Sequence, residues 1–463
     1  MARRSIASST DISRSRTSLL QGTKLRVLAV ASLLVLTVTG SQRLDAQEPT
    51  PPVQWISAGD HLSSLFELYQ HLHQTPELSY EEVETGKRIG EELRSLGFDV
   101  TNGVGGHGVV GVLKNGEGPT VMVRTDLDAL PVTEETNLVY ASKVRVTTKE
   151  GVETGVMHAC GHDIHMTSFI GTARYLAGNK DLWSGTLVFI GQPAEERGAG
   201  AKAMLDDGLF ERFPRPDYAL ALHVDSALDS GKIGYTPGYA LANVDSVDII
   251  VHGRGGHGAY PHTTVDPIVQ AAQLVMALQT IVSREVSPID SAVVTVGAIH
   301  AGAKHNVIPN QCHLQLTVRS YKDETREHVL NAIRRKARGI AEASNAPEPE
   351  ITISEGTPAM KNDAELVERL LPSWRATLGE DNVVPAQPQM GGEDFSHYGL
   401  AGVPIFMFRL GSVETLRLSG YERIGQPPPS LHSSVYYPDA ELSIRTGVVA
   451  TSTAVLDLIG VEK

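Results

Sequence analysis

The stretch TVMVRTDLD, residues 120–128, shows the pattern on which the fold of this chain depends. Its first part is a nearly continuous run of β-formers, and Asp126 and Asp128 follow it directly. Strands without polar alternation are typical of a parallel sheet that is buried on both faces. Segments with helical spacing lie between further runs of this kind at VVGVL (109–113), TLVFIG (186–191), YALALHV (218–224) and PIFMFRL (404–410). We therefore predict an α/β domain, a mostly parallel sheet with helices on both faces.

The pattern changes between residues 241 and 355. Six segments there follow the order β-α-β-β-α-β, which is typical of a ferredoxin-like α+β sandwich. They are VDSVDIIVHG (244–253), DPIVQAAQLVMALQTIVS (266–283), SAVVTVGAI (291–299), QCHLQLTVRS (311–320), ETREHVLNAIRRKARGIAEA (324–343) and EITIS (350–354). We predict that 241–355 form an inserted lid domain, and that 55–240 and 356–463 together form the catalytic domain.

The composition excludes several classes of protein. The chain has 463 residues, a formal net charge of −14 and only two cysteines. A hydrophobic content of 41% is too high for a disordered polymer, and two cysteines are too few for a disulfide-stapled mini-protein. The acidic balance argues against nucleic-acid binding, which requires a basic surface.

The first 46 residues are predicted to be a secretory signal. A basic segment precedes the apolar run 27–38, which is too short to cross a bilayer core of roughly 30 Å. We expect cleavage near Ala46, a stiff spacer at 47–54, and an exported protein, periplasmic or extracellular, without stable membrane association after signal removal. An uncleaved anchor and a mis-assigned start codon are the alternatives.

Polar residues gather where the predicted strands end. Asp126 and Asp128 follow one strand, Glu195 and Glu196 follow a second, and His223 lies near the end of a third. The loop MHACGHDIH (157–165) precedes a helix. Because parallel strands present their carboxyl ends at one sheet edge, we expect a site there. Each of these groups alone could be a helix cap or a solvated loop residue.

Cys160 and His162 flank Gly161, and a thiolate and an imidazole so close can bind one metal ion or bridge two. The other cysteine, Cys312, is predicted to be a core residue rather than a disulfide partner. His165 either orients a ligand or simply begins a helix.

The pair Glu195–Glu196 indicates hydrolysis. Adjacent residues that leave a strand point to opposite sides, so one carboxylate can bind metal while the other faces a substrate water. The alternative is an exposed acidic turn.

Seven motifs occur in the order seen in one known family. The chain resembles the hippurate hydrolase, indole-acetyl-amino-acid hydrolase and N-acyl-amino-acid amidohydrolase family, within the clan of dinuclear-metal aminoacylases and carboxypeptidases. The resemblance extends over roughly residues 62–458 and rests on RTDLDALPV, MHACGHDIHM, GQPAEERGAGA, GRGGHGAYPH, HNVIPN, MGGEDFSHY and LHSS.

The resemblance implies two divalent metal ions per chain, which could be zinc, manganese, cobalt or nickel. It implies Glu195 as the general base and Asp128 as the acid that orients a metal-binding partner. It also implies that the inserted domain contacts the substrate through His257, Asn306 and Arg319. The implied metal ligands are Cys160, His162, Glu196, His223 and His432.

The implied activity is metal-dependent hydrolysis of N-acyl amino acids, with water activated by the metals and an acyl group that the sequence does not specify. The alternatives are a dipeptidase or carboxypeptidase of the same clan and an inactive exported metal- or solute-binding protein. We also expect hinge closure near Tyr239 and Gly356, and a homodimer through the lid domain. The segment 144–153 is longer than usual for the family and is expected to reshape the pocket rim.

Overall fold

The computed structural model describes residues 60–148 and 151–461, so the predicted signal and spacer lie outside the described residues. The largest sheet has eight strands, and its four central strands, β6, β3, β7 and β18, are parallel. Its order is β1 (Asp99–Val104), β2 (Gly108–Asn115), β6 (Gly185–Gln192), β3 (Thr120–Asp126), β7 (Tyr218–Asp229), β18 (Ile405–Val413), β8 (Ile233–Tyr235) and β17 (Val383–Pro385). The predicted mostly parallel sheet is confirmed.

Both faces of this sheet are buried, which explains why its strands lack polar alternation. In β3, Val121 and Val123 belong to one hydrophobic cluster, and Met122 belongs to a second cluster on the opposite face. The second cluster includes residues of α5 (Gly200–Asp206), α6 (Leu209–Arg212) and α10 (Ser396–Leu400). The first includes residues of α2 (Asp60–Gln74), α3 (Val83–Ser95), α4 (His162–Gly178), α9 (Ala364–Leu378) and α12 (Ala440–Ile459).

Helix α12 is the one described helix long and apolar enough to cross a membrane by length and composition. Buried side chains make up 78% of its most apolar window, and the helix packs against α4 and α9. It therefore serves here as a core helix.

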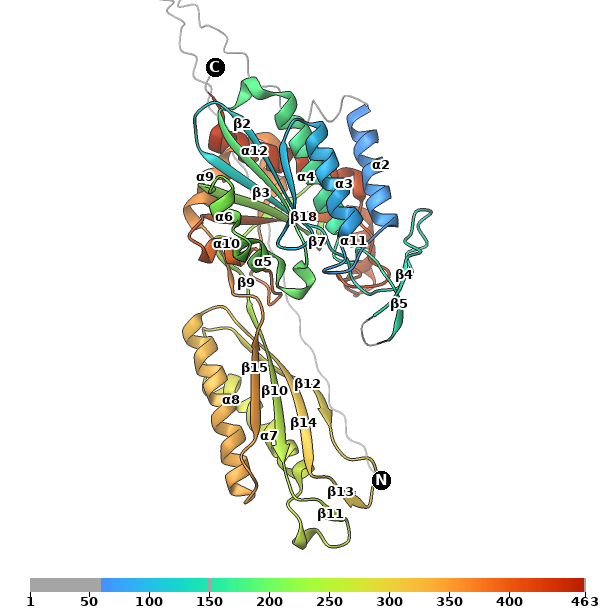
Figure 1. The fold of residues 1–463 in the computed structure, drawn as a ribbon, viewed down its shortest axis with the longest axis vertical. Helices are drawn as coiled ribbons and strands as arrows, with labels where there is room; N and C mark the ends of the chain where they lie inside the picture. Colours follow the sequence, from blue (N-terminus) through green and yellow to red (C-terminus); the bar gives the residue numbers. More distant parts are fainter. Residues whose placement is uncertain (1–59, 149–150, 462–463) are drawn as a thin grey trace, which may run out of the picture. The chain divides into compact units, whose positions relative to one another are not determined.

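A second sheet of four antiparallel strands forms within the inserted segment (Figure 1). Helices α7 (Pro267–Arg284) and α8 (Asp323–Ala343) contribute the core that covers one of its faces. The order along the chain is β-α-β-β-α-β, as expected for a ferredoxin-like sandwich. The order across the sheet is β12 (Ala292–His300), β14 (Gln311–Ser320), β10 (Asn243–His252) and β15 (Glu350–Glu355).

The chain enters and leaves this inserted sandwich side by side. Strand β9 (Gly238–Leu241) leads into it, and β16 (Met360–Asn362), which pairs antiparallel with β9, leads out. Cys312 is a free thiol that is fully buried in the sandwich core.

Two short two-stranded sheets and one further helix complete the described elements that concern the site. Strands β4 (Arg145–Thr147) and β5 (Glu153–Gly155) pair within the long segment before the cysteine-containing loop. Strands β11 (Gly256–His257) and β13 (Val307–Ile308) pair in the inserted segment. Helix α11 (Thr415–Arg423) follows β18.

Candidate active site

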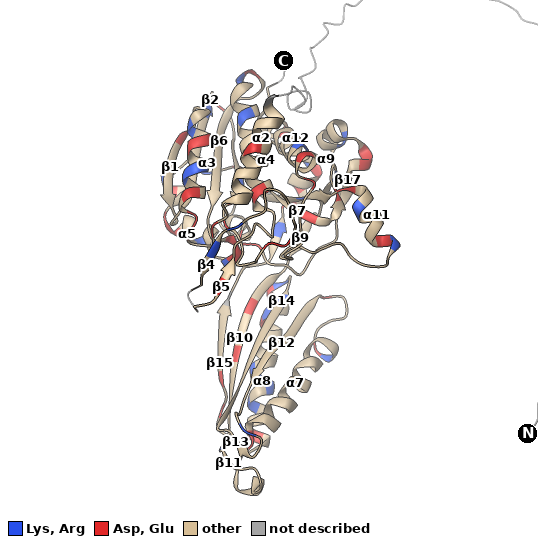
Figure 2. Ribbon diagram, turned by 90° about the vertical axis from the view of Figure 1, so that its right-hand side faces the viewer, with Lys and Arg blue, Asp and Glu red and all other residues tan. Residues whose placement is uncertain are grey.

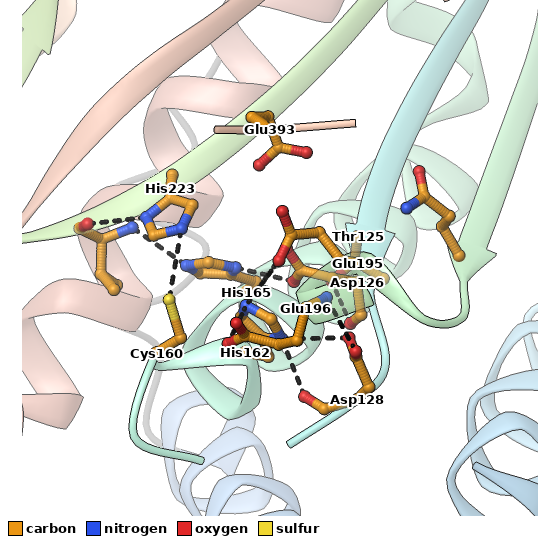
Figure 3. A network of polar contacts seen from close by, with 12 residues as sticks. Thr125, Asp126, Asp128, Cys160, His162, His165, Glu195, Glu196, His223 and Glu393 are labelled. Atoms are coloured by element: carbon orange, nitrogen blue, oxygen red, sulfur yellow. Dashed lines mark hydrogen bonds and ion pairs between the residues drawn. The ribbon is translucent and has the colours of Figure 1, made fainter. Parts of the chain in front are cut away.

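The carboxyl ends of β3, β6 and β7 bring the predicted polar residues together (Figure 3). Asp126 ends β3, a 3₁₀ turn over Glu195–Arg197 follows β6, and His223 lies within β7. Cys160 comes from the loop before α4, and His162 is the first residue of that helix. Gly161 between them has φ 77°, and a Cβ there would lie 2.6 Å from a methyl group of Val224. Glycine at this position therefore permits the tight turn that presents both neighbours to the site.

The five residues implied as metal ligands lie within one cluster. The Sγ of Cys160 is 3.6 Å from Nε2 of His223 and 3.3 Å from Nε2 of His432. Glu196 extends the cluster, with one carboxylate oxygen 3.6 Å from Nε2 of His432 and the other 3.9 Å from Nε2 of His162. Thiolate, imidazole and carboxylate donors within such distances suit a pair of divalent cations.

Hydrogen bonds orient the imidazoles toward this cluster. Nδ1 of His162 lies 2.8 Å from the backbone oxygen of Asp128, and Nδ1 of His223 lies 2.8 Å from the backbone oxygen of Val224. Each Nδ1 therefore donates, and each Nε2 is left with a lone pair for a metal. Nε2 of His162 and Oε1 of Glu196 are buried and have no hydrogen-bond partner among the described residues. Unpaired buried atoms of this kind are costly, and a bound cation satisfies them.

Asp128 connects several parts of the site. Its Oδ2 accepts hydrogen bonds from the hydroxyl of Ser79 at 2.6 Å and from the backbone N–H of Glu196 at 3.0 Å. Its Oδ1 lies 3.5 Å from Nδ1 of His162. The Asp128 carboxylate therefore positions two of the implied metal ligands, Glu196 and His162.

His165, for which the sequence left two alternatives, orients its neighbours. Its Nδ1 lies 2.7 Å from a carboxylate oxygen of Asp126, and its Nε2 accepts the backbone N–H of Val224 at 2.9 Å. Both ring nitrogens are occupied, so neither is free to bind a metal ion.

The ionisable groups strongly perturb one another. Burial, reinforced by Glu196, raises the pKa of the Cys160 thiol well above its usual range. Burial, reinforced by Glu393 and Glu196, also raises the pKa of Glu195 well above its usual range. Burial alone would lower the pKa of His162, but Asp126 and Asp128 raise it well above its usual range. A divalent cation favours the thiolate and the carboxylates over their protonated forms, and it favours neutral imidazole ligands.

Glu195 faces a cavity of about 550 Å³. Glu195 is 8% exposed, and its Oε2 lies 3.9 Å from Nε2 of His162. Among the described residues, its side chain has no hydrogen bond, so the carboxylate is free to act on a group in the cavity. Cys160, His223, His432 and Arg319 line the same space.

A buried arginine behind Glu195 was missed by the sequence analysis. Arg124 forms ion pairs with Asp126 at 2.8 Å, Glu393 at 2.9 Å and Asp394 at 3.2 Å. It also donates to the side-chain oxygen of Gln192 at 3.1 Å. Arg124 thereby links the ends of β3 and β6 to the loop that contains Glu393 and Asp394. A charged residue inside an otherwise apolar strand was the signal that could have identified it.

The three substrate residues implied in the inserted segment separate into two places. Arg319 lines the cavity, and its Nη1 donates to the backbone oxygen of Met390 at 2.6 Å. His257 and Asn306 are exposed and belong to the β11–β13 region, where the N–H of Gly258 donates to the backbone oxygen of Asn306 at 2.9 Å. Neither is among the described residues that line the cavity beside Glu195.

Comparison with known proteins identifies the family. Residues 122–424 match Peptidase family M20/M25/M40. The chain belongs to this family. The hippurate hydrolase of Campylobacter jejuni is 40% identical over 342 residues, which cover 73% of this chain and 85% of that protein. Thermostable carboxypeptidase 1 of Saccharolobus solfataricus is 37% identical over 352 residues, 75% of this chain and 86% of that protein.

A solved structure of the M20 family supports the same assignment. It is a Bacillus subtilis protein described as a dinuclear metal binding peptidase, 32% identical, with a TM-score of 0.70 over 86% of this chain and 99% of that chain. The M20/M25/M40 chain described here is therefore a hydrolase, and its cluster of donors suits two divalent metal ions.

Proposed function

We propose that this M20/M25/M40 hydrolase cleaves the amide bond of N-acyl amino acids and releases a carboxylate and a free amino acid. The observation that carries the proposal is the Glu195 carboxylate, which faces a cavity that also contains the donor cluster and the cation Arg319. A base, a metal site and a fixed positive charge are the groups that hydrolysis of an anionic amide requires.

The residues proposed to hold the two metals are Cys160, His162, Glu196, His223 and His432. The metals would supply a Lewis acid that polarises the amide carbonyl and lowers the pKa of water. Zinc suits the Cys160 sulfur, while manganese, cobalt or nickel suits a site richer in carboxylates.

The protein's own groups would do the rest. Glu195 would take a proton from the attacking water and return it to the departing nitrogen. Arg319 would hold the free carboxylate of the substrate through its planar fork of N–H donors. Asp128 would keep Glu196 and His162 in place during the reaction.

The second candidate is a dipeptidase or carboxypeptidase of the same clan, which the identity to a thermostable carboxypeptidase favours. A panel of acetyl-, benzoyl- and indole-acetyl-amino acids beside plain dipeptides separates the two. We expect larger kcat/KM values for the N-acyl amino acids. Faster hydrolysis of dipeptides would favour the second candidate, and release of no product from any of them would leave a binding protein with an inactive site.

We also propose a homodimer through the inserted sandwich. Helix α7 has no charged residue between Pro267 and Ser283 (Figure 2). Met276 on this helix is 70% exposed. Strand β12 is an edge of the described sheet. Uncharged apolar faces and free strand edges favour pairing with a second copy. Light scattering after size exclusion would measure twice the chain mass for the wild type and a single chain mass for Met276→Glu.

Export is proposed on the basis of residues 1–46 alone. Fractionation of producing cells together with N-terminal sequencing of the mature chain would test it. We expect the activity outside the cytoplasm and a mature end near Gln47. Activity in the membrane pellet with an intact N-terminus would favour an anchor instead.

A further inference from the structure

Arg409 lines the catalytic cavity together with Arg319 and the exposed Arg197, and neither the metal site nor the proposed base explains it. It lies in β18, paired in register with His223 of the neighbouring strand β7. Arg409, His223 and Cys160 all line the cavity. The guanidinium therefore approaches the cavity from the large sheet, whereas Arg319 approaches it from the inserted sandwich.

In the part of the chain that the structure describes, the guanidinium of Arg409 has no anionic partner. Its Nη2 donates to Oε1 of Gln389 at 3.1 Å, and Gln389 in turn donates to Asp225 at 3.4 Å. Among the described residues, no carboxylate lies within the 4.0 Å of an ion pair. Burial lowers the pKa of Arg409 from its usual value. The buried Arg124, by contrast, is paired with three carboxylates.

An arginine that is partly buried and faces a cavity without a counter-ion is suited to a ligand that supplies one. A guanidinium has five N–H donors in a planar fork. Among the described residues, only one of the donors of Arg409 has an acceptor. The fork matches a carboxylate, which can accept two parallel hydrogen bonds. The carboxylates that line the cavity, Glu195 and Glu196, are already assigned to the base and to the metals.

We propose that Arg409 binds a second carboxylate of the substrate, so that the enzyme prefers N-acyl amino acids with two negative charges. The proposal rests on the proposed amidohydrolase function and specifies its substrate class. Arg319 would hold the α-carboxylate, and Arg409 would hold the other. That second carboxylate could belong to an acidic amino-acid side chain or to a dicarboxylic acyl group.

The experiment uses two matched pairs of substrates with the metal-loaded full-length enzyme. N-acetyl-glutamate is compared with N-acetyl-glutamine, and N-succinyl-leucine with N-pentanoyl-leucine. We expect the wild type to prefer the dianionic member of one pair by about 10- to 100-fold in kcat/KM, the range of a charge-assisted hydrogen bond. The pair that shows the preference identifies which part of the substrate carries the carboxylate.

Variants then assign the preference to Arg409. Arg409→Met should abolish the preference within that pair, so that the two kcat/KM values become similar, mainly through a higher KM for the dianion. Arg409→Lys should retain part of the preference. Arg423→Met, on an exposed arginine of α11, is the matched control and should keep the wild-type ratio. Thermal unfolding and metal content of each variant check that the fold and the metal site are intact.

Two results would overturn the proposal, and both differ from failure of the proposed function. A wild type without preference in either pair refutes it, whatever the variants do. An equal loss for both members of a pair in Arg409→Met also refutes it, because Arg409 would then hold the α-carboxylate or only support the site. Absence of turnover both for these four substrates and for the acetyl-, benzoyl- and indole-acetyl-amino acids of the panel would contradict the amidohydrolase function itself. In that case the affinity of Glu195→Gln for N-acetyl-glutamate and N-acetyl-glutamine, measured by calorimetry, still decides the role of Arg409.

Discussion

At the scale of single residues, the site separates groups that bind from groups that react. The imidazoles of His162 and His223 each use Nδ1 for a backbone oxygen, which leaves Nε2 directed at the donor cluster. Glu195 has no such hydrogen bond among the described residues. Burial, reinforced by its neighbours Glu393 and Glu196, raises its pKa and favours its protonated form. A carboxylate with a raised proton affinity is suited to accept a proton from water and pass it on.

Replacing Glu195 with Gln should therefore remove turnover and leave metal binding intact. The amide keeps the size of the side chain but cannot accept the proton, so we expect a loss of about 100- to 10,000-fold in kcat. Metal analysis should give the wild-type content. Glu365→Gln, a change at an exposed acid, is the control. Near-normal turnover in Glu195→Gln would contradict the assignment.

Replacing Cys160 with Ala should lower the metal content below that of the wild type. The change removes the one sulfur that approaches both His223 and His432. Elemental analysis after dialysis measures the effect. Cys312→Ala is the matched control, because Cys312 lies in the core of the inserted sandwich. Full occupancy in Cys160→Ala would mean that the thiol is not a ligand.

At the scale of elements, a buried ionic cluster holds α2 against the first turn of α4, which carries the implied ligand His162. Nδ1 of His73 in α2 lies 2.7 Å from Asp163, which directly follows His162, and Nε2 lies 3.1 Å from Glu134. Burial alone would lower the pKa of His73, but the hydrogen bonds to Asp163 and Glu134 raise it to about 9. Helix α2 and the first turn of α4 are thus joined by a charged imidazole.

This cluster predicts a particular pH dependence of stability. Because the folded-state pKa of His73 lies above the unfolded value near 6.5, its contribution is complete below about pH 6.5 and is lost as the pH rises through about 9. His73→Gln should reduce the free energy of unfolding by about 3 kcal/mol at pH 6, and by much less at pH 10. Urea unfolding at both pH values measures this difference. His71→Gln, an exposed change on the same helix, should show little effect, and a pH-independent loss in His73→Gln would refute the charged state.

At the scale of the whole molecule, the position of His257 in the structure differs from the position that its implied role requires. The resemblance implies that it contacts the substrate, yet it is exposed in β11 and is not among the described residues that line the cavity. Its implied role requires either closure of the inserted domain or delivery of the histidine by a second copy. The proposed homodimer makes the second route testable.

Mixing two inactive variants distinguishes these routes. His257→Ala should lower turnover strongly without changing metal content, and Glu195→Gln should do the same for a different reason. If a partner supplies His257, a dimer that combines the two variants contains one intact site, and an equilibrated mixture should recover about a quarter of wild-type activity. If closure within one chain supplies it, the mixture should stay inactive. Full activity in His257→Ala alone would remove the residue from the mechanism.

The sequence by itself determined those features that depend on local pattern. Strands without polar alternation, helical spacing and the β-α-β-β-α-β order reflect which faces each element buries. The parallel sheet and the ferredoxin-like insertion were therefore predictable. The polar residues at the strand ends were predictable as a site because parallel strands end at one edge. The family followed from ordered motifs.

Only the tertiary structure decided the contacts between segments far apart in the chain. Arg124 pairs with Glu393, 269 residues away. The two ring nitrogens of His165 are hydrogen-bonded to residues of two different strands. The open donors of Arg409 and the position of His257 away from the cavity likewise depend on how distant elements pack. Local periodicity determines which face of an element is buried, but the partner that a buried charge finds there depends on the packing of the whole chain.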